Sequence, residues 1–182
     1  MGFHTFDPGQ ADRLDDESRF RFCSREELLQ HLPREGTVLD LGSGTGFYTD
    51  EVAPFVERVI ALDVQPAMHD LYRENGIPDN VDPVTAEAER LPFQDGTVNG
   101  AFSTMTFHES TTDAALRDLR RVLAPGGSFV VVDWSAAGNG EGGPPLSERF
   151  DADAARSLLE DAGFTVESAA ERSETFAVVA RC

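Results

Sequence analysis

Hydrophobic and polar positions along the chain follow two different periods. Short, nearly continuous apolar runs rich in β-branched residues are typical of strands buried in a parallel sheet, whereas apolar residues spaced three and four apart predict amphipathic helices. Segments of the two kinds alternate along most of the chain. The pattern predicts strands at residues 37–41, 58–63, 80–86, 97–105, 128–134, 164–168 and 176–181, and helices at residues 24–32, 47–55, 66–75, 112–123 and 151–163.

Local signals mark the ends of several predicted helices. Ser24 and Glu27 have the spacing of a capping box, and Pro66 lies in the first turn of its helix, where a missing N–H is tolerated. Gly163 follows the last helix at the position where glycine commonly ends one. Residues 135–148 are rich in glycine and proline, which predicts a loop.

The alternation of strands and helices predicts an α/β fold, with a mostly parallel sheet and helices on both of its faces. At 182 residues the chain suits one domain, long enough to bury roughly two thirds of the surface that its unfolded form would expose. In such a sheet, ligands bind at the carboxyl ends of the strands, near the point where the strand order reverses.

Charge narrows the classes of function. The chain has 33 Asp and Glu residues against 15 basic residues, for a net charge of -18, and every basic residue is arginine. Without lysine, the chain can form neither a Schiff base with pyridoxal phosphate nor the phosphate contact of a Walker loop. The acidity argues against nucleic acid and anionic membranes as partners. We interpret it as an adaptation to a salt-rich, halophilic cytoplasm.

The cysteines and the apolar segments indicate the compartment. Cys23 and Cys182 lie near opposite ends of the chain without metal-ligand spacing, so we interpret both as free thiols in a reducing environment. The N-terminus has no signal-peptide pattern, and no window approaches the length of a membrane span. We therefore expect a cytoplasmic protein with no membrane partner and no bound metal.

The stretch VLDLGSGTG carries the first candidate chemistry. Gly42, Gly44 and Gly46 form a turn between a strand and a helix, spaced more tightly than the glycines that bind dinucleotides, which disfavours a nicotinamide-dependent oxidoreductase. Asp40 precedes the turn and suits a ligand with cationic groups. Asp63 ends the second strand. A carboxylate there can accept hydrogen bonds from the hydroxyls of a ribose, or it can cap the next helix.

Four motifs carry a resemblance to a known family. VLDLGSGTG, ALDVQPAM, EAERLPFQDGTVNGAF and RVLAPGGSFVVVDW occur in order between Val38 and Trp134. Together they resemble the class I S-adenosylmethionine-dependent methyltransferases, of the small type related to the ubiquinone/menaquinone biosynthesis methyltransferases. The resemblance implies a Rossmann-like, seven-stranded, mostly parallel sheet whose last strand is antiparallel. It also implies an N-terminal lid and helix at residues 1–33 and a core that binds S-adenosylmethionine at residues 34–182.

The resemblance assigns the cofactor site residue by residue. It gives Asp63 the ribose and Glu87 the adenine amino group, where the family usually has aspartate. Val98 and Asn99 replace the family's Phe-Asp pair, a change that we expect to affect packing more than chemistry. The residues expected to bind the cofactor are Asp40, Gly42, Ser43, Gly44, Thr45, Gly46, Asp63, Val64, Glu87, Ala88 and Thr104.

The sulfonium of S-adenosylmethionine already activates the methyl group, so the protein must mainly align an acceptor and exclude water. His108 is the candidate catalytic residue, as a general base near neutral pH or as a residue that only shapes the pocket. Trp134 could contact the substrate or cover the edge of the core, and the N-terminus could form a lid or fray. The residues expected in the substrate pocket are Phe3, His4, Phe107, His108 and Trp134.

These observations predict methyl transfer to a small, uncharged or cationic molecule. The alternative is a non-catalytic protein that binds S-adenosylmethionine as a sensor or scaffold. The same motifs support both, because they describe the cofactor site only.

The acidity predicts a salt-dependent stability. A net charge of -18 on a chain of this size repels itself at low ionic strength, and salt screens that repulsion. We expect the melting temperature, measured by calorimetry, to climb as salt rises from tens of millimolar towards molar. A flat response would contradict the halophilic interpretation.

Overall fold

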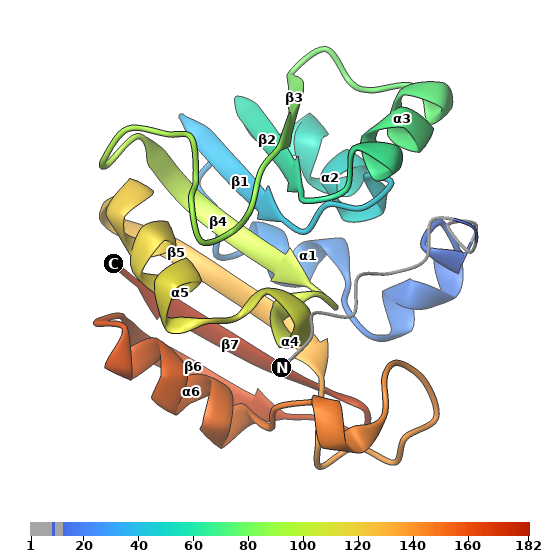
Figure 1. Cartoon of the computed structure of the whole chain (residues 1–182), viewed down its shortest axis with the longest axis vertical. Helices are drawn as coiled ribbons and strands as arrows, with labels where there is room; N and C mark the ends of the chain where they lie inside the picture. Colours follow the sequence, from blue (N-terminus) through green and yellow to red (C-terminus); the bar gives the residue numbers. More distant parts are fainter. Residues whose placement is uncertain (1–8, 10–12) are drawn as a thin grey trace.

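The fold is built on one seven-stranded sheet, as the computed structural model of the chain shows (Figure 1). The structure describes Gly9 and residues 13–182. The strands follow the order β3-β2-β1-β4-β5-β7-β6 across the sheet. Their bounds are β1 Thr37–Leu41, β2 Arg58–Asp63, β3 Val81–Thr85, β4 Val98–Thr104, β5 Leu123–Trp134, β6 Thr165–Glu171 and β7 Thr175–Arg181.

Strand direction confirms the predicted fold class. β1 pairs in parallel with both β2 and β4, so the strand order reverses between them, and β4 pairs in parallel with β5. The last strand, β7, is antiparallel to β5 and to β6. The carboxyl ends of β1 to β5 therefore meet at one edge of the sheet, where ligands of such folds bind.

Helices cover both faces of the sheet (Figure 1). One apolar cluster includes side chains of α1 and α2, together with Tyr72 of α3, and the other includes side chains of α4, α5 and α6. Among the described residues, no helix combines the length and apolar character needed to cross a membrane. The helices are α1 Arg25–Leu29, α2 Phe47–Val52, α3 Pro66–Asn75, α4 Phe107–Ser110, α5 Asp113–Val122 and α6 Ala152–Asp161, with 3-10 helices η2 Glu17–Arg21, η3 Ala53–Phe55 and η4 Leu146–Glu148.

Several elements differ from the sequence prediction: α1 is shorter than the helix predicted at residues 24–32, β6 extends past residue 168 to Glu171, and β5 and α4 show the largest differences. β5 begins at Leu123 instead of residue 128, because Leu123 pairs with Val98 of β4 before the register shifts. The short helix α4 follows β4 at a place where no helix was predicted. The longer β5 reflects its pairing with β4, a contact between distant segments that a local pattern does not register, whereas the four residues of α4 are too few to show a helical period.

Gly46 connects the fold to the candidate site. It lies at the N-cap of α2 with φ +90°, and a Cβ atom at this position would collide with the ring of Tyr72 from α3. Tyr72 itself is fully buried. The turn after β1 therefore depends on a residue without a side chain, for both its backbone angle and its packing.

Replacing Gly46 with alanine tests this packing. We expect Gly46→Ala to lower the free energy of unfolding by about 3 kcal/mol or more, because the strain of a positive φ adds to overpacking. Gly96→Ala is the matched control: its φ is +68°, but its Cβ would meet nothing within 4 Å, so strain alone should cost about 1–2 kcal/mol. Urea denaturation without ligand measures both. Equal losses would contradict the packing argument.

Candidate functional site

The glycine turn lies at the carboxyl end of β1 and is held from the next strand. The N–H groups of Gly42 and Ser43 both donate to the carbonyl of Leu62, at 2.8 and 2.9 Å. A Cβ atom on Gly42 would collide with the side chain of Thr106, which follows β4, whereas one on Gly44 would approach a single atom, in Leu14, at 3.3 Å. The turn is thus packed at Gly42 and sparsely covered at Gly44.

Asp40 lies under this turn with one oxygen unused. Its Oδ2 accepts a hydrogen bond from the hydroxyl of Thr49 at 2.6 Å, while the buried Oδ1 has no partner. Burial raises the pKa of Asp40 to about 7; the Thr49 hydrogen bond opposes that rise, and the charge of Asp63 adds to it. A buried acceptor without a donor is costly, so the site suits a ligand that brings a donor or a positive charge.

Asp63 ties the turn to the start of the next helix. Its Oδ2 accepts from the N–H of Gly44 at 2.9 Å, and its Oδ1 accepts from the N–H of Gln65 at 2.8 Å. The N-cap of α3 is Gln65, without a side-chain cap bond, so Asp63 binds the backbone just ahead of the helix and does not form the cap considered from the sequence. Each carboxylate oxygen keeps a further lone pair, which leaves capacity for ligand hydroxyls. Val64 is 47% exposed beside it.

The ends of β3 and β4 complete this edge. The N–H of Ala86 donates to the carbonyl of Asp63 at 3.1 Å, which brings the segment containing Glu87 and Ala88 beside β2. Glu87 is exposed, whereas Thr104 is buried at the end of β4. Met105, the next residue, has φ +59°, a left-handed conformation that is uncommon for a residue with a side chain and is found at functional sites.

His108 forms a pair that the sequence analysis did not anticipate. Its Nδ1 lies 2.9 Å from both oxygens of Asp133, and its backbone N–H donates to Oδ2 of Asp133 at 2.6 Å. Asp133 is fully buried near the end of β5 and also accepts from the N–H of Trp134 at 2.7 Å. In the sequence, only the presence of a carboxylate, Asp133, inside an otherwise apolar strand could have indicated this pair.

The pair sets the charge of His108. Burial disfavours the imidazolium, but the hydrogen bonds and negative charges of Asp133 and Glu109 outweigh it and raise the pKa of His108 to about 9. Oε1 of Glu109 lies 3.6 Å from Nε2. At neutral pH the side chain is therefore protonated, and a protonated imidazole cannot accept another proton.

The other residues predicted to line the substrate pocket do not lie together. The ring of Phe107 is buried and packs against Phe129, Phe150 and Phe176, so it belongs to the core and not to the wall of a pocket. Burial of the largest apolar side chain of α4 explains this position. Phe3 and His4 lie outside the described residues.

Trp134 contacts both the N-terminal segment, at Phe22, and the loop after β5. Its ring meets that of Phe22 edge-on at 4.7 Å between centroids, and the guanidinium of Arg149 lies 5.6 Å from its ring. A Cβ atom on Gly143 would collide with the same ring. Trp134 thus anchors the N-terminal segment and the loop at residues 135–148 to the end of β5.

That loop is held by two charged side chains. The buried carboxylate of Glu174 accepts from the N–H groups of Asn139, Gly140 and Glu141 at 3.0 to 3.1 Å. Arg149 donates to the carbonyls of Ser135, Gly142 and Pro144. The sequence predicted the loop but neither set of contacts: Glu174 lies on a distant segment, and the contacts of Arg149 depend on how the loop itself folds.

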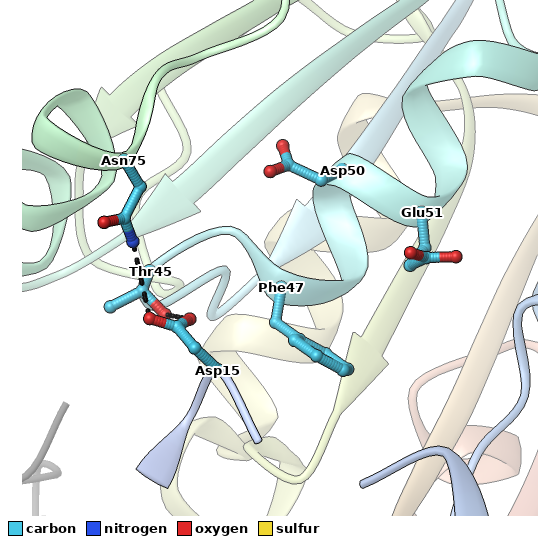
Figure 2. A pocket seen from close by; sticks show the side chains of 6 residues that line it. All are labelled: Asp15, Thr45, Phe47, Asp50, Glu51 and Asn75. Atoms are coloured by element: carbon cyan, nitrogen blue, oxygen red, sulfur yellow. Dashed lines mark hydrogen bonds between the residues drawn. The ribbon is translucent and has the colours of Figure 1, made fainter. Parts of the chain in front are cut away.

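A hollow of about 450 Å³ opens beside the glycine turn (Figure 2). Within it, Oδ1 of Asp15 accepts from the hydroxyl of Thr45 at 2.6 Å, and Oδ2 from the amide of Asn75 at 3.4 Å. Thr45 of the glycine turn lines this hollow, whereas Asp40 and Asp63 do not. Its lining residues are Asp15, Thr45, Phe47, Asp50, Glu51 and Asn75.

Comparisons with known proteins agree with this geometry. The family model of the methyltransferase domain matches residues 39–131. The ubiquinone/menaquinone biosynthesis C-methyltransferase UbiE of Shewanella frigidimarina is 36% identical over 147 residues, covering 73% of this chain and 57% of that protein. The biotin biosynthesis bifunctional protein BioHC of Cellvibrio japonicus is 38% identical over 105 residues, covering 56% of this chain and 21% of that protein. The chain thus spans about a fifth to three fifths of the length of these relatives.

Solved structures extend the likeness over nearly the whole chain. A SAM-dependent methyltransferase from Aquifex aeolicus has a TM-score of 0.88 and 32% identity, covering 97% of this chain and 99% of that one. A methyltransferase crystallised with the Haloferax volcanii Trm112 methyltransferase activator has a TM-score of 0.79 at 20% identity, covering 98% and 99%, and shows a shared fold. From the matched domain and the Aquifex likeness, the chain belongs to the class I S-adenosylmethionine-dependent methyltransferases, whose cofactor is S-adenosylmethionine.

Proposed function

We propose that this protein transfers a methyl group from S-adenosylmethionine to a small-molecule acceptor at the carboxyl edge of β1, β2, β4 and β5. One observation carries the proposal: Oδ1 of Asp40 is a buried acceptor without a donor, directly below a glycine turn. S-adenosylmethionine brings an ammonium and a sulfonium group, so its charges match this acceptor. The sparse cover at Gly44 lets a ligand approach the backbone.

The remaining cofactor contacts follow from the strand ends. We assign the ribose hydroxyls to Asp63, whose two oxygens each make one backbone hydrogen bond and can accept another. We assign the adenine to the segment of Glu87 and Ala88, which the bond between Ala86 and Asp63 holds beside β2. Val64 is exposed between them and offers an apolar contact to the nucleoside.

When bound, the cofactor supplies an electrophilic methyl group on a sulfonium, with a neutral leaving group. The protein's part is therefore to orient the acceptor and exclude water. His108 is held by Asp133 and carries a proton at neutral pH, which supports a role in shaping the pocket and not in accepting a proton. The general-base role becomes the less favoured of the two roles considered for this histidine.

Our proposal that the methyl acceptor is a small molecule is based on the names of two relatives and on the net charge of this chain. The names of UbiE and BioHC refer to ubiquinone, menaquinone and biotin biosynthesis, all of which concern small molecules. The net charge of -18 argues against nucleic acid as the acceptor. Cys23 and Cys182 are separate free thiols, which supports our proposal of a reducing, cytoplasmic location.

A transfer assay tests the proposed function. We expect the wild-type protein to move labelled methyl groups from S-adenosylmethionine into the small-molecule fraction of a cell extract.

We expect Asp63→Ala to weaken S-adenosylhomocysteine binding by about 2–3 kcal/mol, because hydrogen bonds to a charged acceptor are lost. Asp82→Ala, which removes an exposed carboxylate from β3, is the control and should bind normally. Binding without any labelled product would argue against catalysis.

His108→Gln separates the two roles of this histidine. Glutamine keeps a hydrogen-bonding group but cannot exchange a proton at these pH values. We expect turnover to fall by less than about tenfold between about pH 6 and 8, with an unchanged pH profile. A general base with a pKa of about 9 would instead give a wild-type rate that climbs with pH towards 9. A loss of about a hundredfold or more, with that climb abolished, would restore the base role.

Stability against pH provides the structural control for this variant. Because the folded state raises the pKa of His108 to about 9, the pair with Asp133 stabilises most at pH values below the unfolded pKa of about 6.5. That contribution is lost as pH rises through about 9. The wild-type advantage over His108→Gln in urea denaturation should shrink across this window.

A further inference from the structure

Arg19 lies in the described part of the N-terminal segment, next to the glycine turn. Its guanidinium stacks over the rings of Phe47 and Tyr48, the first residues of α2, at 5.1 and 5.0 Å from the ring centroids. The hydroxyl of Tyr48 donates to the carbonyl of Arg19 at 3.0 Å. The segment is fastened to the turn itself, because Asp15 accepts from Thr45 at 2.6 Å.

Within the part of the chain that the structure describes, this guanidinium has no carboxylate as an ion-pair partner. Its hydrogen bond goes to the carbonyl of Leu14, and none of the ion pairs formed among Gly9 and residues 13–182 includes it. That is unexpected in a chain with 33 acidic residues. Burial is the main cause that lowers the pKa of Arg19, and a desolvated guanidinium is stabilised when a carboxylate pairs with it.

An opposite and equally incomplete group lies close by. Oδ1 of Asp40 is buried and has no donor, and the charges of Asp40 and Arg19 act on each other's pKa. Among the described residues, an acceptor without a donor and a cation without an ion pair thus flank one glycine turn. A ligand end that carries both an ammonium and a carboxylate would satisfy both groups.

We infer that Arg19 binds the α-carboxylate of the methionyl part of the cofactor, while Asp40 binds its α-ammonium. The inference rests on the proposed function and adds a residue from outside the family-matched segment at residues 39–131. A planar guanidinium can hold a carboxylate through two parallel hydrogen bonds. In this arrangement η2 completes the cofactor site, and the contacts of Leu14 and Asp15 with the turn serve to position Arg19.

Two ligands that differ only in the amino-acid end test this assignment. S-adenosylhomocysteine carries the α-carboxylate and α-ammonium, whereas 5′-methylthioadenosine keeps the nucleoside and the sulfur but lacks both charges. Isothermal titration calorimetry measures the affinity of each for the wild-type protein and for Arg19→Met. We expect the variant to bind S-adenosylhomocysteine about tenfold to a hundredfold more weakly, and 5′-methylthioadenosine within about twofold of wild type.

Matched variants separate a carboxylate contact from a structural effect. Arg19→Lys keeps the charge without the planar fork and should recover part of the lost affinity. Arg21→Met removes an exposed arginine of the same segment, which stacks on Phe22, and should leave both affinities unchanged.

Three outcomes would overturn the assignment. If Arg19→Met weakens both ligands equally, Arg19 only supports the segment, and if it weakens neither, the carboxylate binds elsewhere. Affinity for 5′-methylthioadenosine also reports whether the variant is folded. If the wild-type protein binds neither ligand, the proposed function itself fails and this assignment fails with it.

Discussion

The hydrogen bond from the N–H of Gly44 to Asp63 is the contact on which the shape of the glycine turn, at the carboxyl edge of the sheet, depends. A glycine turn has few side-chain contacts of its own, so its shape must be imposed by its surroundings. Asp63 imposes it from the end of β2 and also directs the start of α3 through Gln65. The same carboxylate therefore orders the turn and lies where the nucleoside is expected, which couples the geometry of the turn to that of its ligand.

A second buried carboxylate orders the other half of the edge in the same way. Asp133, near the end of β5, accepts hydrogen bonds from the backbone N–H groups of His108 and Trp134 and pairs with Nδ1 of the His108 ring. Asp133 therefore holds the segment after β4 against β5. The pairing that positions the imidazole of His108 also raises its pKa, so the ring stays protonated at neutral pH. The same carboxylate therefore both positions the imidazole and leaves little of it unprotonated at neutral pH, where a general base would have to accept a proton.

Much of the fold could be predicted from the sequence because the deciding signals are local. β1, β2 and α3 have the bounds that the apolar pattern predicted, and the capping box of Ser24 and Glu27 forms. The positions of Asp40 on β1 and of Asp63 at the end of β2 were equally predictable, since both belong to short apolar runs, whereas their binding of the cofactor remains a proposal. The short helix α4 escaped prediction because four residues carry no usable period.

The sequence by itself determined the order of elements, the sheet class and the place of the glycine turn, since each depends on neighbours a few residues apart. Tertiary structure decided the partners of the charged groups. Asp133 meets His108 across 25 positions, and Glu174 meets Gly140 across 34. It also decided that Phe107 enters the core, while Arg19 forms no ion pair with Gly9 or residues 13–182. The reason is physical: burial and pairing depend on which distant segments the sheet brings together, and no local period encodes that.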